Sequence, residues 1–522
     1  MKHVKLLLIF IFVLQLTTVY SQTKNDNYYN ITDYGAIGDS LTKCTKAIQR
    51  AIDVCSKNGG GTVHISSGVY MTGMLVLKDN VVLDLNAGSE LRAIPDVKEF
   101  PDTEPNTPSN FNIIFRHALI YAEDAKNIGI IGQGTINGQG QAEAFKPTTL
   151  KKPDRYQNRP SLLRIVNCNG VRLENIRLIN SGFWTVHLMA SHDVVVQGIS
   201  LYSRTANYNN DGIDIDGCEN VRISDCYINS LDDAISIKAT GNKPVRNIMI
   251  NNCMLSSHCN AIRMGAENFA GFEDVHFSNC HIFESANGIT FQNIDGFPMK
   301  RISFKGISFF ETGIPIHVIT GRKSYPIGVP EEEYPCPPKE LPASIEDLVF
   351  DNITGSQIGY YKGAGVGNDT VIRHYRNAII LSGHENAPLI RCTMSNIFMH
   401  FNGGGTMEDS KVTLPEVNNM PNPSSEPTPV YGIIARNTEN LLLTNIKLSY
   451  QEKDVRPAIA IENSTNAILK SINVHSGGVL PVIQYCNSIK PYIENCTEFF
   501  DKGEMKVISE KNGNVINKDN FY

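Results

Sequence analysis

The chain has 522 residues, enough for several ordinary domains or for one long repeat domain. It carries 47 basic and 53 acidic residues, a formal charge of −6, and shows no basic stripe. This balance argues against nucleic acid as a partner, and it means that any anionic substrate must be held by local cations.

The first residues have the pattern of a secretory signal peptide. Two lysines precede an apolar run that ends near Leu16 and is followed by compact residues. The run is shorter than the ~20 residues needed to cross a bilayer, so we expect cleavage rather than anchoring. We predict a signal peptide over residues 1–21, a mature protein over 22–522 that is secreted or periplasmic, and no membrane insertion.

A helix is predicted next, over residues 42–56. Its sequence, TKCTKAIQRAIDVCS, places apolar residues at helical spacing, and Asn58 with three glycines follows. The ends of a solenoid need caps, and the repeat described next makes this helix the N-terminal cap.

A repeat of about 27 residues runs through most of the chain. Segments such as NGVRLENIRL and ENVRISDCYI alternate apolar and polar residues, as a strand with one buried face does. Successive units are spaced by 23, 27, 27, 27 and 27 residues, counted on the anchors Val171, Val194, Val221, Ile248, Val275 and Ile302. Similar units recur at Val81, Ile128, Leu348, Leu441 and Ile468. A period in the twenties with short strands and no helical pattern predicts an all-β, single-domain right-handed parallel β-helix.

The register explains several residues at the corners of the coils. Cys226, Cys253 and Cys280 each stand five residues after an anchor, which favours a buried column of small residues over disulfides. One position earlier stand Asp225, Asn252 and Asn279, residue types that tolerate left-handed turns.

Acidic residues concentrate at Asp211, Asp232 and Asp233. Asp211 and Asp232 are 21 positions apart, about one coil, so we expect them on one face of neighbouring coils. Clustered carboxylates raise the pKa of at least one member, and a protonated acid beside ionised partners is what glycoside hydrolysis requires. For Asp214 and Asp216 a turn role is favoured, and a calcium site remains an alternative for the cluster.

At these residues the chain resembles the polygalacturonase family, glycoside hydrolase family 28. The resemblance covers ITDYGAIGDS, the capping helix, GGGTVHISSGVY and SGFWTVHL, and then two motifs at the acidic cluster. The Asn-Thr-Asp motif of the family is matched by Asn209-Asn210-Asp211, and its Asp-Asp pair by Asp232-Asp233. The resemblance implies that Asp232 protonates the leaving oxygen while Asp211 and Asp233 activate the attacking water, with inversion. It also implies that Asn209 contacts the substrate.

Two family motifs are altered. The family has a catalytic His in a Gly-His-Gly turn. Here His258 stands between Ser257 and Cys259, one position short of the expected column. We keep His258 as a catalytic candidate, with a surface turn histidine as the alternative.

The Arg-Ile-Lys motif that binds the substrate carboxylate in the family reads Thr290-Phe291-Gln292 here. Threonine cannot replace a fork-shaped guanidinium. Arg263 stands 27 residues before Thr290, and Lys238 lies in the neighbouring column, so both are expected on the face of the aspartates and are candidate substrate-binding residues. The alternative is that they form ion pairs with Asp233 or Glu267.

The leading prediction is a glycosidase acting on pectin or a related polysaccharide, as a monomer without metal or other cofactor. A polysaccharide lyase and a non-catalytic carbohydrate-binding solenoid are the alternatives. The aromatic residues Phe183, Trp184 and Phe291 are read as core or stacking residues without an assigned subsite. Proline-rich loops at 335–342 and 415–429 are expected to close one end of the groove, which favours attack at chain ends.

Overall fold

The computed structural model describes residues 27–149, 151–204, 208–322, 330–364, 370–415, 426–475, 477, 480, 482–499, 507–510 and 516–517. The predicted signal peptide and most of the proline-rich loop at 415–429 lie outside these residues. No helix in the described ranges is long and apolar enough to span a membrane.

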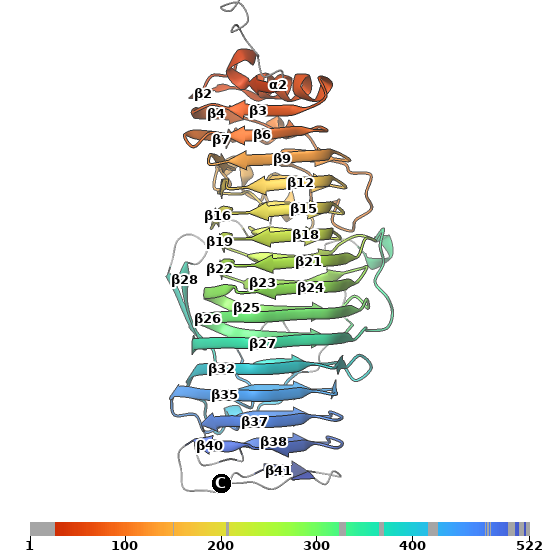
Figure 1. Ribbon diagram of the computed structural model, residues 1–522, viewed down its shortest axis with the longest axis vertical. Coiled ribbons are helices and arrows are strands. Elements are labelled where there is room, and N and C mark those ends of the chain that lie inside the picture. The colour runs from red at the N-terminus through yellow and green to blue at the C-terminus, as the bar shows by residue number, and fades with distance from the viewer. Residues whose placement is uncertain are drawn as a thin grey trace, which may run out of the picture.

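The chain forms a tall parallel β-helix, as predicted, with its coils stacked along the long axis (Figure 1). Each coil supplies one strand to each of three parallel ladders, and a side chain at one position stacks on the same position of the next coil. Outside these ladders the described residues form one antiparallel hairpin, β28 (Tyr360–Ala364) with β29 (Thr370–His374).

The first ladder carries the sequence anchors. Its strands are β1 (Tyr28–Asn30), β3 (Gly61–Ile65), β6 (Val81–Leu85), β9 (Lys126–Gly132), β12 (Asn169–Glu174), β15 (His192–Gln197), β18 (Glu219–Ser224), β21 (Val245–Asn251), β24 (Phe272–Ser278), β31 (Leu389–Ile390), β34 (Thr438–Glu439), β39 (Tyr492–Glu494) and β42 (Ile516–Asn517). The first halves of the long strands β26 (Met299–Thr320), β27 (Ile345–Ile358), β32 (Thr393–Gly403), β35 (Leu442–Glu452) and β37 (Ile468–His475) belong to it as well.

The second ladder follows the first along each coil. Its strands are β2 (Asp39–Lys43), β4 (Gly68–Thr72), β7 (Ser89–Ala93), β10 (Thr135–Asn137), β13 (Arg177–Ile179), β16 (Ser200–Ser203), β19 (Tyr227–Ser230), β22 (Met254–Ser257), the beginning of β25 (His281–Asn293), later parts of the long strands, and β40 (Thr497–Phe499).

The third ladder completes each coil. Its strands are β5 (Leu75–Val76), β8 (Ala118–Glu123), β11 (Ser161–Val166), β14 (Val186–Met189), β17 (Ile213–Asp216), β20 (Ile235–Ala239), β23 (Asn260–Asn268), the ends of β25 and β26, β30 (Ile379–Ser382), β33 (Ile433–Arg436), β36 (Ile459–Glu462), β38 (Ile483–Cys486) and β41 (Val507–Glu510).

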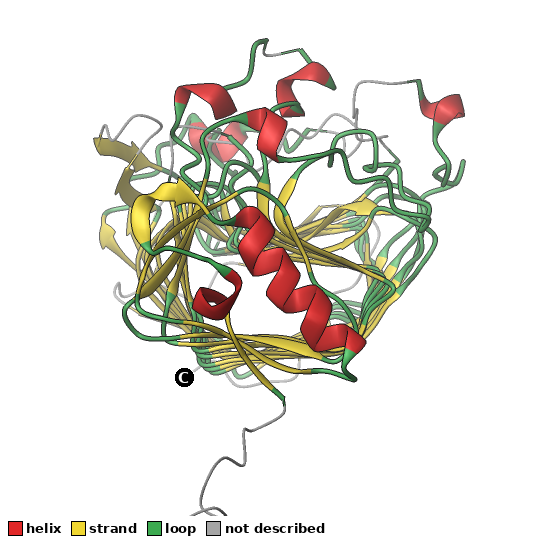
Figure 2. Ribbon diagram, turned by 90° about the horizontal axis from the view of Figure 1, so that it is seen from above, coloured by secondary structure: helices red, strands yellow, loops and turns green. Residues whose placement is uncertain are grey.

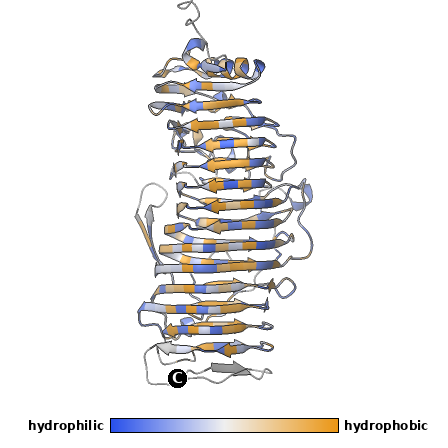
Figure 3. Cartoon of the chain, viewed as in Figure 1, coloured by the Kyte–Doolittle hydropathy of each residue, from blue (hydrophilic) through white to orange (hydrophobic). Residues whose placement is uncertain are grey.

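The repeat register is confirmed through the middle of the chain. Val171 pairs with Val194 and Val194 with Val221, and the column continues through the other 27-residue units to Leu348. These anchors are fully buried, and burying one such side chain stabilises the fold by about 1.5–3 kcal/mol. Figure 3 shows the resulting mixture of apolar and polar positions along each strand.

The register prediction fails in the last coils by one residue. Ile468 pairs with Leu442 rather than with Leu441, and the buried residue at the anchor position is Ala467. The sequence Ala467-Ile468-Leu469 offers apolar residues in both phases of the alternation, so the pattern alone could not select the buried phase.

The corner residues behave as predicted. All twelve cysteines are described and are free thiols, and Cys226, Cys253 and Cys280 are buried one above another. The preceding column of Asp225, Asn252 and Asn279 has φ values of 58°, 54° and 52°. The Asn252 amide donates to Asp225 Oδ1 at 3.3 Å, so these residues close left-handed corners and bond along the stack.

The capping helix is present as α2 (Thr45–Lys57), three residues later than predicted at its start. Residues Asp39–Lys43 are taken up by β2, which pairs with β4, and this pairing delays the helix. Its buried residues Ile48, Ala51, Ile52 and Cys55 face the first coil. Figure 2 shows α2 across the end of the coil and the short helices gathered on one side of it.

Those short helices lie on long excursions of the chain. They are η2 (Val97–Glu99), η3 (Glu143–Phe145), η4 (Asp154–Tyr156), η5 (Glu331–Glu333) and η6 (Asp409–Lys411); a further one, η1 (Ile31–Tyr34), lies beside α2. Contacts of these excursions with the outer face of the third ladder determine the shape of the site described next.

Candidate active site

A cavity of about 130 Å³ opens where the third ladder begins. It is lined by six of the seven residues proposed from the sequence: Asn209, Asp211, Asp232, Asp233, Lys238 and Arg263. The other lining residues include Tyr156, Trp184, Cys259 and Glu267. The structure therefore brings six of the seven candidate residues together at one cavity.

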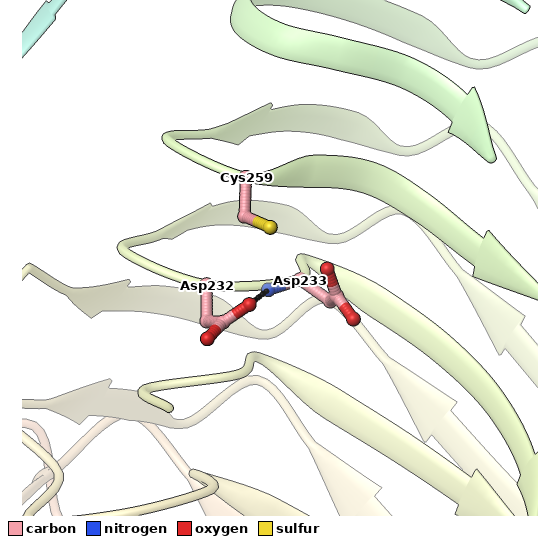
Figure 4. Close-up of side chains that lie close together, drawn as sticks. All are labelled: Asp232, Asp233 and Cys259. Atoms are coloured by element: carbon pink, nitrogen blue, oxygen red, sulfur yellow. Dashed lines mark hydrogen bonds between the residues drawn. The ribbon is translucent and has the colours of Figure 1, made fainter. Parts of the chain in front are cut away.

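The three aspartates stand on two stacked turns between the second and third ladders. Asp211 precedes β17, and Asp232 with Asp233 precedes β20, which pairs with β17. The turns are bonded directly, since Gly212 N donates to Asp233 O at 2.8 Å. Figure 4 shows Asp232 and Asp233 beside Cys259 of the next turn, with the backbone N–H of Asp233 bonded to Asp232 Oδ1 at 3.1 Å. The predicted placement on neighbouring coils is confirmed.

Burial dominates the electrostatics of this cluster. Desolvation, followed by the charges of Asp214 and Asp232, raises the pKa of Asp211 well above its ordinary value. Desolvation and Asp232 also raise the pKa of Asp233, although Arg263, Lys238 and the Asn260 amide oppose this shift. Carboxyls that interact this strongly titrate as a coupled group and not as independent residues.

The turn interpretation of Asp214 and Asp216 is wrong. Both residues belong to strand β17, in the alternating segment Ile213-Asp214-Ile215-Asp216, and both carboxyls are buried on its outer face. Asp216 accepts hydrogen bonds from Thr240 N at 2.7 Å and from the Thr240 hydroxyl at 2.5 Å, and its Oδ2 lies 3.0 Å from His187 Nε2. Desolvation raises the pKa of Asp214 well above its ordinary value.

Lys238 is the central cation of the cavity floor. Its Nζ lies 3.6 Å from Asp211 Oδ2, 3.7 Å from Asp214 Oδ1 and 3.5 Å from Glu267 Oε2. It also stands 4.1 Å from the ring centroid of Trp184, so the ammonium covers one face of that ring. The sequence alternative of an ion pair with Glu267 is thus confirmed for Lys238.

Arg263 and the altered carboxylate motif form one unit. Arg263 on β23 pairs in register with Thr290 on β25, as the 27-residue offset predicted. Its guanidinium donates to Gln292 Oε1 at 2.5 Å and to Gly265 O at 3.2 Å. The cation of this face therefore comes from one coil earlier, and Gln292 positions it. Phe291 is a core residue, packed on Phe304.

His258 is the one proposed site residue that does not line the cavity. Its Nδ1 lies 2.7 Å from the hydroxyl of Tyr361, on the hairpin strand β28. Burial, then Arg373 and Arg204, lower its pKa to about 4, so the ring is neutral at ordinary pH. Cys259 instead faces the aspartates, in the column where the sequence offset of 27 from Asp232 had placed it.

The structure adds residues that the sequence reading missed, on the loop 151–160. Tyr156 lines the cavity, and its ring stands 5.5 Å from that of Phe183. Arg155 donates to Asn209 Oδ1 at 3.0 Å, and the Asn209 amide lies 3.5 Å from Asp232 Oδ2. The basic segment LKKPDRYQNR was the feature of the sequence that could have pointed to this loop. It lies outside the repeat, so counting residues along the repeat could not place it relative to the aspartates.

The cluster was also considered as a metal site. One ligand atom from each of Asp232, Asp233 and Cys259 lies within 4.8 Å of the others. Calcium prefers six to eight oxygen ligands, and a thiol is a poor ligand for it. The donor set therefore does not fit the calcium alternative.

A larger hollow of about 590 Å³ lies on the open face of the first ladder, beside Arg222, Met249 and His276. Its acidic residues are the exposed Asp193 and the half-buried Asp274, and Asp274 is already paired with Arg301 at 2.7 Å. The buried carboxylates of Asp211, Asp233 and Glu267 line the smaller cavity, which we take as the functional site.

The comparisons with known proteins agree with this architecture. The sequence model of glycosyl hydrolases family 28 matches residues 97–362, just over half of the chain, and a model described as rhamnogalacturonase A/epimerase, pectate lyase-like, matches residues 28–97. The chain is 33% identical to a probable polygalacturonase of Vitis vinifera over 221 residues, 40% of this chain and 44% of that protein. It is 31% identical to an endo-polygalacturonase of Pectobacterium carotovorum subsp. carotovorum over 226 residues, 40% of this chain and 54% of that protein.

The chain thus spans about half the length of the curated relatives it matches. Among solved structures, the exopolygalacturonase of Thermotoga maritima has a TM-score of 0.60 at 20% identity, covering 80% of this chain and 92% of that one, which shows the shared fold. The family match includes both aspartate turns, Lys238 and Arg263. The chain belongs to glycosyl hydrolases family 28.

Proposed function

We propose that this protein is a polygalacturonase-like glycosidase that hydrolyses glycosidic bonds in pectin or a related polysaccharide. The observation that carries the proposal is the convergence of Asp211, Asp232 and Asp233 on one cavity of a family 28 β-helix. Two carboxyl groups flanking the scissile bond, one protonated and one ionised, are what this reaction needs.

The acid role is proposed for Asp232. It is less buried than Asp211 and Asp233, so it is the member of the cluster most accessible to a leaving oxygen. Ser230 and Ser257 both donate to its backbone carbonyl at 2.6 Å and hold the turn in place.

The base role is proposed for Asp211, assisted by Asp233. An inverting reaction needs acid and base about 6.5–9.5 Å apart, so that a water fits between them. Oxygens of the adjacent Asp232 and Asp233 lie within 4.8 Å, which favours Asp211 on the neighbouring turn as the group that activates the water. The ammonium of Lys238 opposes the upward shift that burial, Asp214 and Asp232 impose on the pKa of Asp211, and so favours the ionised form that a base needs.

Attack at chain ends is part of the proposal, because the outer face of the third ladder is covered on both sides of the cavity. On one side Arg164 and His187 are fully buried: Arg164 donates to Asn112 Oδ1 at 3.1 Å, and the ring of Phe115 stands 4.5 Å from that of His187. On the other side the excursion around Leu414 covers Ile380 and Ile434. A polymer cannot lie through such a cavity, whereas its end can enter.

The loop at 330–344 belongs to the same cover. Asn110 donates through its amide to Cys336 O at 2.7 Å, and Cys336 N donates back to Asn110 Oδ1 at 2.9 Å. The two excursions are therefore joined beside the cavity by reciprocal hydrogen bonds.

The lyase alternative needs a free base beside the sugar. Lys238 is engaged by three carboxylates and Arg263 by Gln292 and Gly265, so neither is a good proton acceptor. We also propose export and a single catalytic domain over residues 22–522, on the pattern of the first 21 residues and on the continuous repeat.

The test is a screen of homogalacturonan, rhamnogalacturonan, neutral and sulfated glycans for products. The proposal expects new reducing ends on at least one acidic polysaccharide, without the ultraviolet band of an unsaturated sugar. Products carrying that band would favour the lyase, and binding without any new reducing ends would favour a non-catalytic solenoid.

A further inference from the structure

The loop 151–160 places two arginines against residues that line the cavity, Arg155 beside Asn209 and Arg159 over Phe183. In the described part of the chain neither arginine forms an ion pair with a carboxylate. The loop is anchored where Arg159 Nε donates to Gly182 O at 3.0 Å, and its short helix η4 presents Tyr156 to the cavity. Arg155 and Arg159 flank that tyrosine.

Arg155 is half-buried and lies beside Asn209, which lines the cavity. Its guanidinium carbon stands 5.2 Å from the ring centroid of Tyr156 and 5.7 Å from that of Tyr208. Its hydrogen bond to a side chain of the cavity goes to the neutral amide of Asn209. Among the described residues no carboxylate comes within 4 Å of it. A guanidinium stacked on aromatic rings is preorganised to bind an anion with its free edge.

Arg159 lies deeper and is only 3% exposed. Its guanidinium stacks on Phe183 at 4.8 Å, and its second terminal nitrogen has no hydrogen-bond acceptor in the described part of the chain. Burial lowers its pKa to about 10, against the opposing charges of Asp211 and Asp232, neither of which reaches it as an ion pair. A buried charge without a counter-ion is costly and therefore calls for a partner.

In the described part of the chain no aspartate forms an ion pair with Arg159, so the cluster does not supply that partner. Asp211 pairs with Lys238, and Asp233 accepts from the Asn260 amide at 2.5 Å. Arg263, which stands one coil before the altered family motif, is bonded to Gln292 of that motif. Arg155 and Arg159 on the loop 151–160 are thus the two cations near this site, within the described residues, that we consider for binding an anion.

We propose that Arg155 and Arg159 form an anion-binding subsite that holds an acidic group of the bound sugar, either a carboxylate or a sulfate ester. The inference rests on the proposed function for its ligand class, and it places substrate charge recognition on a loop instead of on the strand position occupied by Thr290 and Gln292. The bound anion provides the missing acceptor for Arg159 and an opposite charge for Arg155.

The experiment measures binding rather than turnover. Asp232→Asn protein is titrated in a calorimeter with three probes: a galacturonate trimer, the same trimer with its carboxylates reduced to alcohols, and a sulfated galactose oligomer. The titrations are repeated after adding Arg155→Gln or Arg159→Lys. Arg172→Gln is the matched control, since Arg172 is exposed on β12 and paired with Glu174 at 2.9 Å.

We expect Arg155→Gln to weaken binding of the acidic probe about tenfold or more, because a charge-assisted hydrogen bond is lost, and to leave the reduced trimer unchanged. The probe that shows this loss identifies the group as carboxylate or sulfate. Arg159→Lys keeps the buried positive charge but lacks the planar guanidinium that binds an anion through two N–H groups. It should therefore weaken binding of the same acidic probe, while the urea unfolding midpoint stays near that of the parent.

Equal weakening of acidic and reduced probes, or no weakening of any, would overturn the subsite, as would a parent protein that binds neither acidic probe. The proposed function fails separately. Arginine-dependent anion binding in a protein that releases no reducing ends would sink the hydrolase alone, and hydrolysis without arginine dependence would sink the subsite alone.

Discussion

The ammonium of Lys238 lies 3.6 Å from Oδ2 of Asp211, with both side chains almost completely buried. Asp214 and Glu267 lie at similar distances from the same nitrogen. Lys238 therefore offsets part of the repulsion and desolvation cost of three buried carboxylates. The folded structure around the cavity relies on that positive charge.

Lys238→Met should destabilise the protein strongly. Removing one partner of a buried ion pair costs about 3–5 kcal/mol, since the remaining charges have no compensation. The pKa of Asp211 and Asp214 is raised by burial, so these carboxyls become protonated as pH falls through that raised range. The loss in free energy of unfolding caused by Lys238→Met should therefore be largest at neutral pH and become smaller on acidification. Urea unfolding at several pH values checks this, with the exposed Lys126→Met as control; a deficit independent of pH would contradict it.

The raised pKa values also predict opposite pH trends for activity and stability. Burial raises the folded pKa of Asp211 and Asp233 above the ordinary aspartate value near 4. The folded state then binds protons more readily than the unfolded chain, so these groups add stability at low pH and lose that contribution as pH rises through the folded pKa. A base in the cluster is ionised only above the same range.

We therefore expect kcat/KM to fall on acidification at a pH clearly above about 4, while the unfolding midpoint holds or rises there. A pH–rate profile measured beside a urea titration gives both curves. Activity that persists unchanged down to about pH 4 would mean that the raised carboxyls take no part in the rate-limiting step.

Much of the fold was predictable because a solenoid repeats one local rule. Stacking puts Val171, Val194 and Val221 in one column, so a simple count along the sequence predicts spatial neighbours. The same count brought Asp211 together with Asp232 and Arg263 with Thr290. It failed at Ile468, where neighbouring apolar residues fit either phase.

The site was less predictable wherever the chain leaves the repeat. The loop 151–160 has no register, so nothing in the count linked Arg155 to Asn209. Asp214 and Asp216 were misread because nearby asparagines and glycines suggested a turn, although the Ile-Asp-Ile-Asp alternation fits the strand that they form. The presence of Asn and Gly favoured a turn, whereas the alternation of apolar and polar residues correctly indicated a strand.

His258 and Cys259 should differ in what they contribute. His258 bonds Tyr361 outside the cavity, whereas the Cys259 thiol accepts from the Asn260 amide at 3.1 Å and lies beside the catalytic candidates Asp232 and Asp233. We expect Cys259→Ala to lower kcat and shift the pH–rate profile. His258→Ala should lower the free energy of unfolding by about 1 kcal/mol and leave kcat/KM near that of the parent. The reverse assignment of effects would restore His258 to the site.

The covered outer face predicts the product pattern. Because Arg164 and His187 are buried on one side and Ile380 on the other, only a chain end should reach Asp232. The smallest product should appear from the first time points, with viscosity falling slowly relative to reducing-end release. Chromatography of an early digest decides this, and an early ladder of long oligomers would show that the polymer passes through an open groove.

The most direct test of the account compares two Asp→Asn substitutions that lie seven residues apart. Asp232 lines the cavity, whereas Asp225 is an exposed corner residue with a φ of 58° that asparagine adopts equally well. We predict that Asp232→Asn lowers the rate of reducing-end release from the acidic polysaccharide by about 100-fold or more, with little change in the unfolding midpoint, and that Asp225→Asn leaves the rate unaltered. An Asp232→Asn protein that still releases reducing ends at the parental rate would contradict the assignment of hydrolysis to this cluster.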